Sequence, residues 1–183
     1  MKVPQRWRAC QGATLLEVMI AVLIIGVGLL GIASLQVAAL QGANNAQFRS
    51  RATDLAASLA DRMRANLAAD NDYRFDAEFD CDTDAPPTNV CAMLPSATDQ
   101  AGIVECTPKQ MAVYDVWEIQ CTNGVRSALP GGTLVVACTD SDADDTDDCS
   151  DNSVFQISVT WQAQKRLGGS DNVVLSIIPG AQR

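Results

Sequence analysis

The stretch Gly12-Ala13-Thr14-Leu15-Leu16-Glu17 stands at the start of a long apolar run and decides how the rest of the chain is interpreted. No charged residue occurs from Val18 to Phe48, and Val18 to Leu35 contains only apolar or small residues. That run is long enough to cross the hydrocarbon core of a bilayer. The carboxylate of Glu17 lies at its edge, where a charge costs free energy unless it finds a partner. The stretch therefore predicts a membrane helix with a functional carboxylate in its first turn.

The residues before this run form a short basic flank. Lys2, Arg6 and Arg8 are its charged residues, and residues 1–12 contain no acid, which is typical of a cytoplasmic flank. A secretory signal is cut after its apolar segment, whereas the Gly12-Ala13 junction lies before it. A cut at this junction leaves the apolar helix as the new N-terminus. Glu17 then lies about one helical turn from the new amino group.

This pattern resembles the N-terminal signal of type IV pilins and type II secretion pseudopilins. The resemblance implies that a prepilin peptidase cuts after Gly12 and methylates the amine of Ala13. It also implies that Glu17 pairs with the terminal amine of a neighbouring subunit during assembly. The family usually has Phe as its first mature residue, so Ala13 departs from the pattern.

Composition narrows the function classes. Removing the three basic residues of segment 1–12 from the chain's 13 leaves 10 against 22 acidic residues, a net charge of −12. A chain this acidic is a poor partner for nucleic-acid phosphates. The sequence contains no histidine, the most frequent general base. We therefore expect neither nucleic-acid binding nor enzymatic activity.

Six of the seven cysteines lie in the part of the chain expected to be exported. Cys10 belongs to the leader; the others are Cys81, Cys91, Cys106, Cys121, Cys138 and Cys149. An even number of cysteines in an exported domain predicts disulfides. Zinc is the competing interpretation, but the chain has no C-x-x-C pair and no histidine to favour it.

The spacing of the cysteines trims the 15 pairings that six cysteines allow. In a helix over 108–122, Cys106 and Cys121 would lie about 20 Å apart, beyond disulfide reach. Cys138 and Cys149 flank one loop and form the easiest pair. The other four then pair as Cys81–Cys106 with Cys91–Cys121, or as Cys81–Cys121 with Cys91–Cys106.

A long helix is expected from Thr14 to Ala69, its first part (about 15–40) in the membrane. Apolar residues recur every three or four positions in its second half, which predicts a face that packs on a globular head. They are Phe48, Ala52, Leu55, Leu59, Met63 and Leu67. A break near Gly42-Ala43-Asn44-Asn45 is the alternative, since glycine and asparagine weaken helices.

The remaining residues predict an α+β head over 70–183. A polar, loop-like segment over 70–107 is followed by Thr107-Pro108, an N-cap and first-turn proline that begin a helix. Met111, Tyr114, Trp117 and Cys121, with Val113, mark its expected apolar face. Strands are expected over 133–139, 154–162 and 173–178, the last two joined by Gly168-Gly169-Ser170-Asp171. The pattern predicts a small antiparallel sheet packed on the long helix.

The loop between the first two strands is strongly acidic. Asp140, Asp142, Asp144, Asp148 and Asp151 stand at positions typical of calcium ligands in an EF-hand-like loop. At the sixth position of such a loop, where an EF-hand requires glycine, the chain has Asp145. At the last ligand position it has Asp151 instead of Glu. A solvated acidic loop is the favoured interpretation. Calorimetry with millimolar calcium tests the alternative, that the crowded carboxylates hold an ion.

Several further stretches resemble one group of minor pilins, the PilV family. They are Leu15–Val18, Gly28–Ala33, Leu35-Gln36, Asp61–Asn66, Leu129–Gly132 and Ile157–Trp161. The resemblance implies a single-pass inner-membrane prepilin with a cytoplasmic N-terminus and a periplasmic head. It further implies assembly with other minor pilins, the major pilin and the assembly platform near the tip of an extracellular fibre, with a role in adhesion and twitching motility. A tip adhesin is an expected partner.

Overall fold

The computed structural model describes residues 14–69, 71–75, 81, 87, 90–91, 104–122, 124–142, 144, 149, 152–163 and 168–180. The chain divides into two compact units, Met1–Gly42 and Ala43–Arg183. The second unit, the head, contains all the residues of the hydrophobic core.

The long helix α1 spans Leu15–Ala65. Thr14 caps it, because the backbone N–H of Glu17 donates to Thr14 Oγ1 at 3.3 Å. The helix continues through Gly42–Asn45, so the expectation of one helix is confirmed. It ends four residues earlier than expected. After Asn66 the chain forms the short 3₁₀ turns η1 (Leu67–Ala69) and η2 (Asn71–Tyr73) instead of further α-helix.

The second long helix of the head, α2 (Pro108–Trp117), begins with a complete capping box. Gln110 N–H donates to Thr107 Oγ1 at 3.3 Å, and Thr107 N–H donates to Gln110 Oε1 at 2.9 Å. The helix widens into the π-helical turn η3 (Glu118–Thr122), and the single turn α3 (Val125–Ala128) follows. The expected helix start at Thr107-Pro108 is therefore confirmed.

Three antiparallel strands in the order β1-β2-β3 form the sheet: β1 (Thr133–Thr139), β2 (Val154–Gln162) and β3 (Ser170–Ile177). The first two strands match the expected bounds. β3 begins three residues early because Ser170 and Asp171 pair with Gln162 and Trp161 instead of forming the turn. Positive φ angles of 72° at Gly168 and 133° at Gly169 instead mark the turn between the strands.

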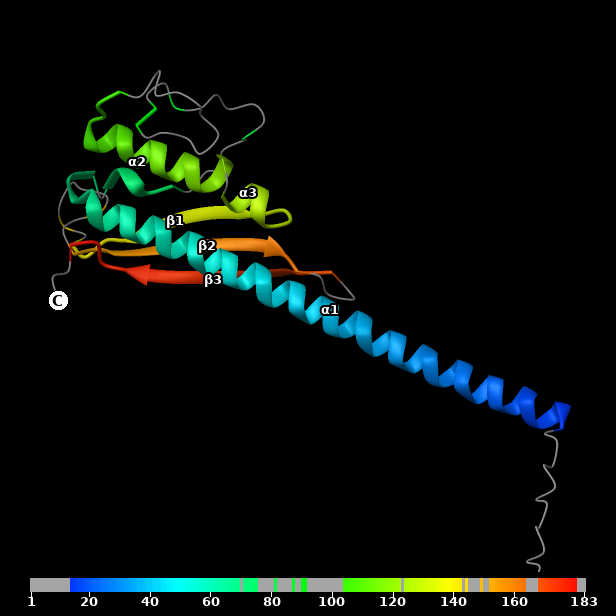
Figure 1. The fold of residues 1–183 in the computed structure, drawn as a ribbon. Coiled ribbons are helices and arrows are strands. Elements are labelled where there is room, and N and C mark those ends of the chain that lie inside the picture. Colours follow the sequence, from blue (N-terminus) through cyan, green and yellow to red (C-terminus); the bar gives the residue numbers. More distant parts are fainter. Residues whose placement is uncertain are drawn as a thin grey trace, which may run out of the picture. The chain divides into compact units, whose positions relative to one another are not determined.

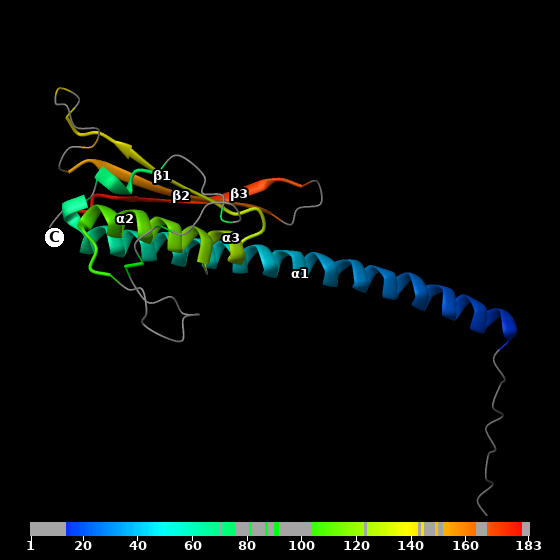
Figure 2. The ribbon, with the colours of Figure 1, turned by 90° about the horizontal axis from the view of Figure 1, so that it is seen from above.

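The head part of α1 (residues 43–65), α2 and α3 lie on one face of the sheet, where α1 and α2 lie side by side (Figures 1 and 2). The strand residues on this face were expected from their alternation, and all are buried: Phe155, Ile157, Val159 and Trp161. From α1 the core receives Ala52, Ala56, Leu59, Ala60 and Met63. Leu67 was wrongly assigned to this face; the helix has already ended there, and the side chain is exposed.

The face of α2 that enters the hydrophobic core differs from the expected one. Ala112, Val116 and Ile119 belong to the core cluster, whereas Val113 is exposed. Tyr114 and Trp117 are buried beside each other, with ring centroids 5.9 Å apart, on another side of the helix. The expected face was misassigned because α2 is covered on more than one side, so its apolar residues do not form a single stripe.

The turn before β1 depends on two glycines. Gly131 has a φ of +57°, a conformation that L side chains rarely adopt. At Gly132, an added Cβ would come within 2.4 Å of the Val125 carbonyl oxygen. The Leu129–Gly132 stretch is thus explained by a close approach of backbone between α3 and β1.

Candidate assembly site

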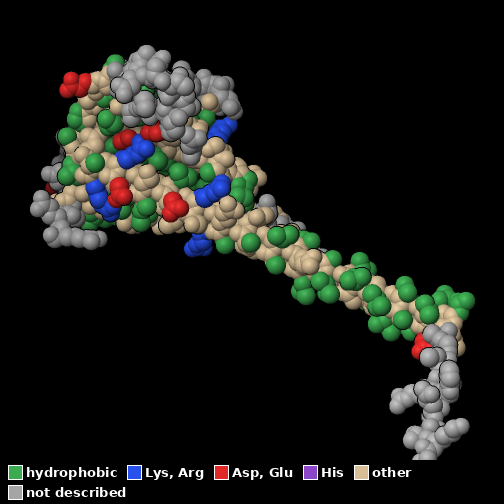
Figure 3. All heavy atoms as spheres, viewed as in Figure 1, with side chains coloured by type: hydrophobic (Ala, Val, Ile, Leu, Met, Phe, Trp, Pro, Cys, Tyr) green, Lys and Arg blue, Asp and Glu red, His purple; other side chains and the backbone are tan. Residues whose placement is uncertain are grey.

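The first half of α1 exposes its apolar side chains on all sides. An 18-residue window of the helix has a mean hydropathy of 2.7, and none of it is buried within the chain. Large apolar residues from Leu15 to Leu40 are between half and four-fifths exposed. Figure 3 shows hydrophobic side chains gathered over this part of α1. A surface of this kind is stable only when a membrane or other protein chains cover it.

Glu17 lies in the first turn of α1 and is its only acidic residue there. The exposed N–H groups of a helix N-terminus favour a negative charge at this point. Thr14 and Glu17 have the spacing of a capping box, and half of that box is formed by the Glu17 N–H bond to Thr14 Oγ1. Thr14 was expected to cap the helix that begins there, and this bond confirms it. Gly12 and Ala13, the expected cleavage and methylation positions, lie outside the described residues.

A polar cluster joins the end of α1 to η2 and α2. One nitrogen of Arg62, Nη1, donates to Asp115 Oδ1 at 2.7 Å and to Glu118 Oε2 at 2.8 Å. The Tyr73 hydroxyl donates to the other oxygen of Asp115 at 2.6 Å. Asn66 Nδ2 donates to the carbonyl oxygen of Pro108 at 2.9 Å. Residues from α1, η2, α2 and η3 are thus tied together around Arg62 and the buried Asp115 carboxylate.

Burial and hydrogen bonding shift two groups of this cluster. Burial raises the pKa of Tyr73 above its ordinary value, and the bond to the Asp115 carboxylate raises it further. Burial acts to lower the pKa of Arg62, but the bonds to Glu118 and Asp115 outweigh it and raise the pKa. Both groups therefore stay protonated throughout the physiological range.

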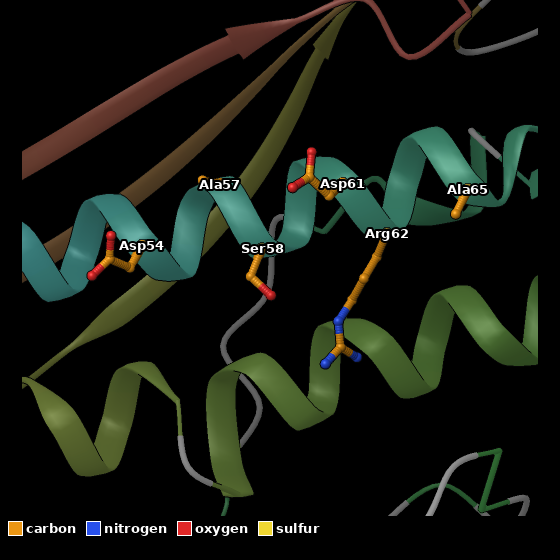
Figure 4. Close-up of a pocket in the computed structure, with 6 residues that line it drawn as sticks. All are labelled: Asp54, Ala57, Ser58, Asp61, Arg62 and Ala65. Atoms are coloured by element: carbon orange, nitrogen blue, oxygen red, sulfur yellow. The ribbon is translucent and has the colours of Figure 1, made fainter.

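The Asp61–Asn66 stretch divides its side chains between two sides of α1. Arg62 extends from α1 towards α2, while Asp61 points away from α2 (Figure 4). Asp61 accepts from Arg64 Nη1 at 2.9 Å, and both side chains are at least half exposed. Met63 is fully buried in the core. The stretch that was singled out by resemblance is therefore the junction between α1 and the rest of the head.

Two family models match the chain. Residues 7–33 match the prokaryotic N-terminal methylation motif. Residues 34–117 match the model described as type IV pilin Tt1218. Over these ranges the chain is similar to a type IV pilin domain preceded by a methylation motif. No curated protein and no solved structure matched the chain in the comparisons made.

The two matches agree with the geometry. The methylation motif covers Glu17 and most of the exposed apolar helix, and the pilin model covers the Arg62 cluster as far as Trp117. The sheet lies beyond both matched ranges. Type IV pilins are structural proteins, so the pilin domain indicates a pilin or pseudopilin role, and the apolar helix fits a membrane-anchored pilin. The resemblance to pilins stated from the sequence is confirmed at this level.

Among the described residues, the head contains three disulfides: Cys81–Cys121, Cys91–Cys106 and Cys138–Cys149. This is the second of the two arrangements that cysteine spacing left open. Cys81–Cys121 and Cys91–Cys106 tie the segment before α2 to the two ends of the helix, at Cys106 and at Cys121 in η3.

The base of the acidic loop is held by hydrogen bonds as well as by a disulfide. Ser153 Oγ, which is buried, donates to Asp140 Oδ1 at 3.1 Å and accepts from Ser141 N–H at 2.9 Å. Asp142 Oδ1 accepts from Asp144 N–H at 3.1 Å. Asp148 and Asp151 lie outside the described residues, and within the described part of the chain no three His, Cys, Asp or Glu side chains form a group suited to a metal ion.

Proposed function

We propose that this chain is a minor pilin of a type IV pilus, of the PilV kind, which helps to initiate fibre assembly. The proposal rests chiefly on the first half of α1, an apolar helix that the chain leaves uncovered, with one carboxylate in its first turn. In a membrane that surface contacts lipid. In a fibre it contacts the same helix of neighbouring subunits, which replaces lipid contacts with helix packing.

In this proposal, the prepilin lies in the inner membrane with its N-terminus in the cytoplasm and its head in the periplasm. A prepilin peptidase cuts after Gly12 and methylates Ala13. The Glu17 carboxylate then pairs with the terminal amine of the subunit already in the fibre. In the low-dielectric interior of a helix bundle, such a pair is stabilised far more than in water, and an unpaired carboxylate is penalised. Glu17 therefore fixes the axial position of each new subunit.

Assignment to a minor pilin rather than to a type II secretion pseudopilin is supported by two stretches. The resemblance of Asp61–Asn66 and Leu129–Gly132 is to PilV, and the structure gives both a role in the head, as the α1–α2 junction and as the turn into β1. Other minor pilins, the major pilin, the assembly platform and a tip adhesin are the partners that this proposal implies.

A deletion strain tests the proposal. We expect loss of surface pili and of twitching motility while type II secretion continues, with restoration by the gene in trans. Loss of secretion with intact pili would contradict it and would identify a pseudopilin. Intact pili and intact secretion would favour a different class of function, a membrane-tethered module that binds calcium or a protein partner.

A further inference from the structure

The outer edge of β3 is unprotected in a way that is unusual for an exported protein. β3 pairs with β2 in unbroken register from Ser170 to Ile177, without a bulge. Its other edge has no strand partner among the described residues. Proteins normally protect such edges with lysine, proline or a bulge. β3 contains neither lysine, arginine nor proline, and its only charge is Asp171 near the start.

The sheet face away from the helices is also free of charge. The three strands contribute thirteen residues to this side of the sheet, and none of them is Asp, Glu, Lys or Arg. Among them are Thr133, Val135, Gln156, Ser158, Asn172 and Val174. Val174 is half exposed. An uncharged face is notable in a chain whose net charge after residue 12 is −12. A charged partner is not favoured there, whereas a second uncharged strand is.

The opposite edge of the sheet is already occupied. Phe75 pairs with Val136 of β1, donating its N–H to the Val136 carbonyl at 2.9 Å and accepting from Val136 N–H at 2.7 Å. β1 and β3 are parallel, because both are antiparallel to β2. Pairing β3 of one copy with β1 of the next would keep the subunits in one orientation, but Phe75 stands in the way.

Antiparallel pairing of two copies through their β3 edges is excluded by direction. Antiparallel pairing of two β3 strands places a twofold axis normal to the sheet. That axis reverses the helix segment 43–65, which lies across the sheet (Figure 2). The two heads would then have opposite orientations, which subunits of one fibre do not adopt.

We propose that the β3 edge binds an extended strand from a different subunit of the same fibre, an inference that rests on the proposed function. Main-chain hydrogen bonds supply the affinity and alternate side chains the specificity. On the helix side, half-buried Val173 and Leu175 favour apolar residues of the partner. On the outer side, Asn172, Val174 and Ser176 favour uncharged polar or β-branched residues.

Site-specific photo-cross-linking in producing cells tests this proposal. A photoreactive amino acid replaces exposed Ser176 in the full-length chain, and mass spectrometry identifies the peptide joined to it. We expect an adduct with another filament subunit at a segment of alternating apolar and uncharged residues. An adduct with a second copy of this chain, an adduct at a charged loop, or no adduct would overturn the proposal.

A matched pair of variants adds the control. Val174→Lys places a charge on the free edge, whereas Val135→Lys places it on the same face and in the same row of the sheet, on the strand that Phe75 covers. We expect Val174→Lys to abolish the adduct and Val135→Lys to retain it, with both heads melting normally. Equal effects of the two variants would contradict the edge as the binding element. The adduct and the deletion phenotype are separate readouts. If deletion abolishes pili but no adduct forms, only this inference is refuted. If an adduct forms but deletion leaves pili intact, the proposed function is refuted.

Discussion

Arg62 shows how one side chain can hold two helices together. Its Nη1 bonds to both Asp115 and Glu118, and its side chain is 30% exposed against 8% for Asp115. A cation shared between two carboxylates offsets the cost of burying them, so removing it leaves both acids without a positive charge beside them. The cluster is therefore a requirement of the head fold rather than a binding site.

Arg62→Met should lower the free energy of unfolding by about 2 kcal/mol, the usual range for a hydrogen bond to a charged group in a partly buried position. Arg64→Met removes an exposed pair with Asp61 and should cost less than about 0.5 kcal/mol. Urea denaturation of the two variants measures both values. Equal losses would contradict the role assigned to Arg62.

The raised pKa of Tyr73 predicts how the stability of the head changes at alkaline pH. Its pKa is raised in the folded protein, so the folded state holds the phenol proton more tightly than the unfolded state. The resulting stability is fully present below the ordinary tyrosine pKa of about 10 and is lost as the pH rises above it. Thermal melts from pH 8 to 11 should show this loss, and Tyr73→Phe should weaken the alkaline dependence. If Tyr73→Phe left the pH dependence of the melting temperature unchanged, Tyr73 would not be its source.

Glu17→Ala should leave cleavage after Gly12 largely intact and block entry into the fibre, because the terminal amine of a neighbour would lack its partner. Glu17→Asp is the matched control, since it keeps the charge while shortening its reach. Immunoblots of membrane and sheared-filament fractions measure both steps. Normal incorporation of Glu17→Ala would refute the pairing role.

At the level of elements, the turn between α3 and β1 depends on a close backbone approach. Gly132→Ala should cost about 2 kcal/mol, since the new methyl group would come too close to the Val125 carbonyl oxygen. Gly180→Ala has no atom within 4 Å of the added Cβ and serves as control. Thermal unfolding measures both variants. Equal melting temperatures would contradict the prediction, because they would show that the turn shifts to accommodate the new methyl group.

The elements also show what a sequence can predict. The alternation of β2 and the capping signal at Thr107 gave correct bounds because each depends on neighbouring residues. The face of α2 was misassigned because its surroundings depend on residues far along the chain. Similarly, nothing near Arg62 in sequence shows that Asp115 and Glu118 lie beside it, 53 and 56 residues away. The first turn of α1 was predictable, whereas the cluster at its end was not.

At the level of the whole molecule, the disulfides close loops of different lengths in the head. Cys81–Cys121 closes a separation of 40 residues and Cys138–Cys149 one of 11. On the chain-entropy model the longer loop contributes about 4 kcal/mol and the shorter about 3. Paired serine substitutions should therefore destabilise the head more at Cys81 and Cys121 than at Cys138 and Cys149. The reverse order in denaturant melts would contradict this.

At the level of the whole molecule, the proposed function describes a subunit that moves from a membrane into a fibre. Its apolar helix begins with a carboxylate, its head contains its own core, and its methylation motif links the two to a processing step. The most direct test is intact-mass and N-terminal analysis of the chain recovered from sheared surface filaments. The account predicts a mature chain that begins with N-methylated Ala13. A chain that retains residues 1–12, or that has lost the apolar helix, would contradict it.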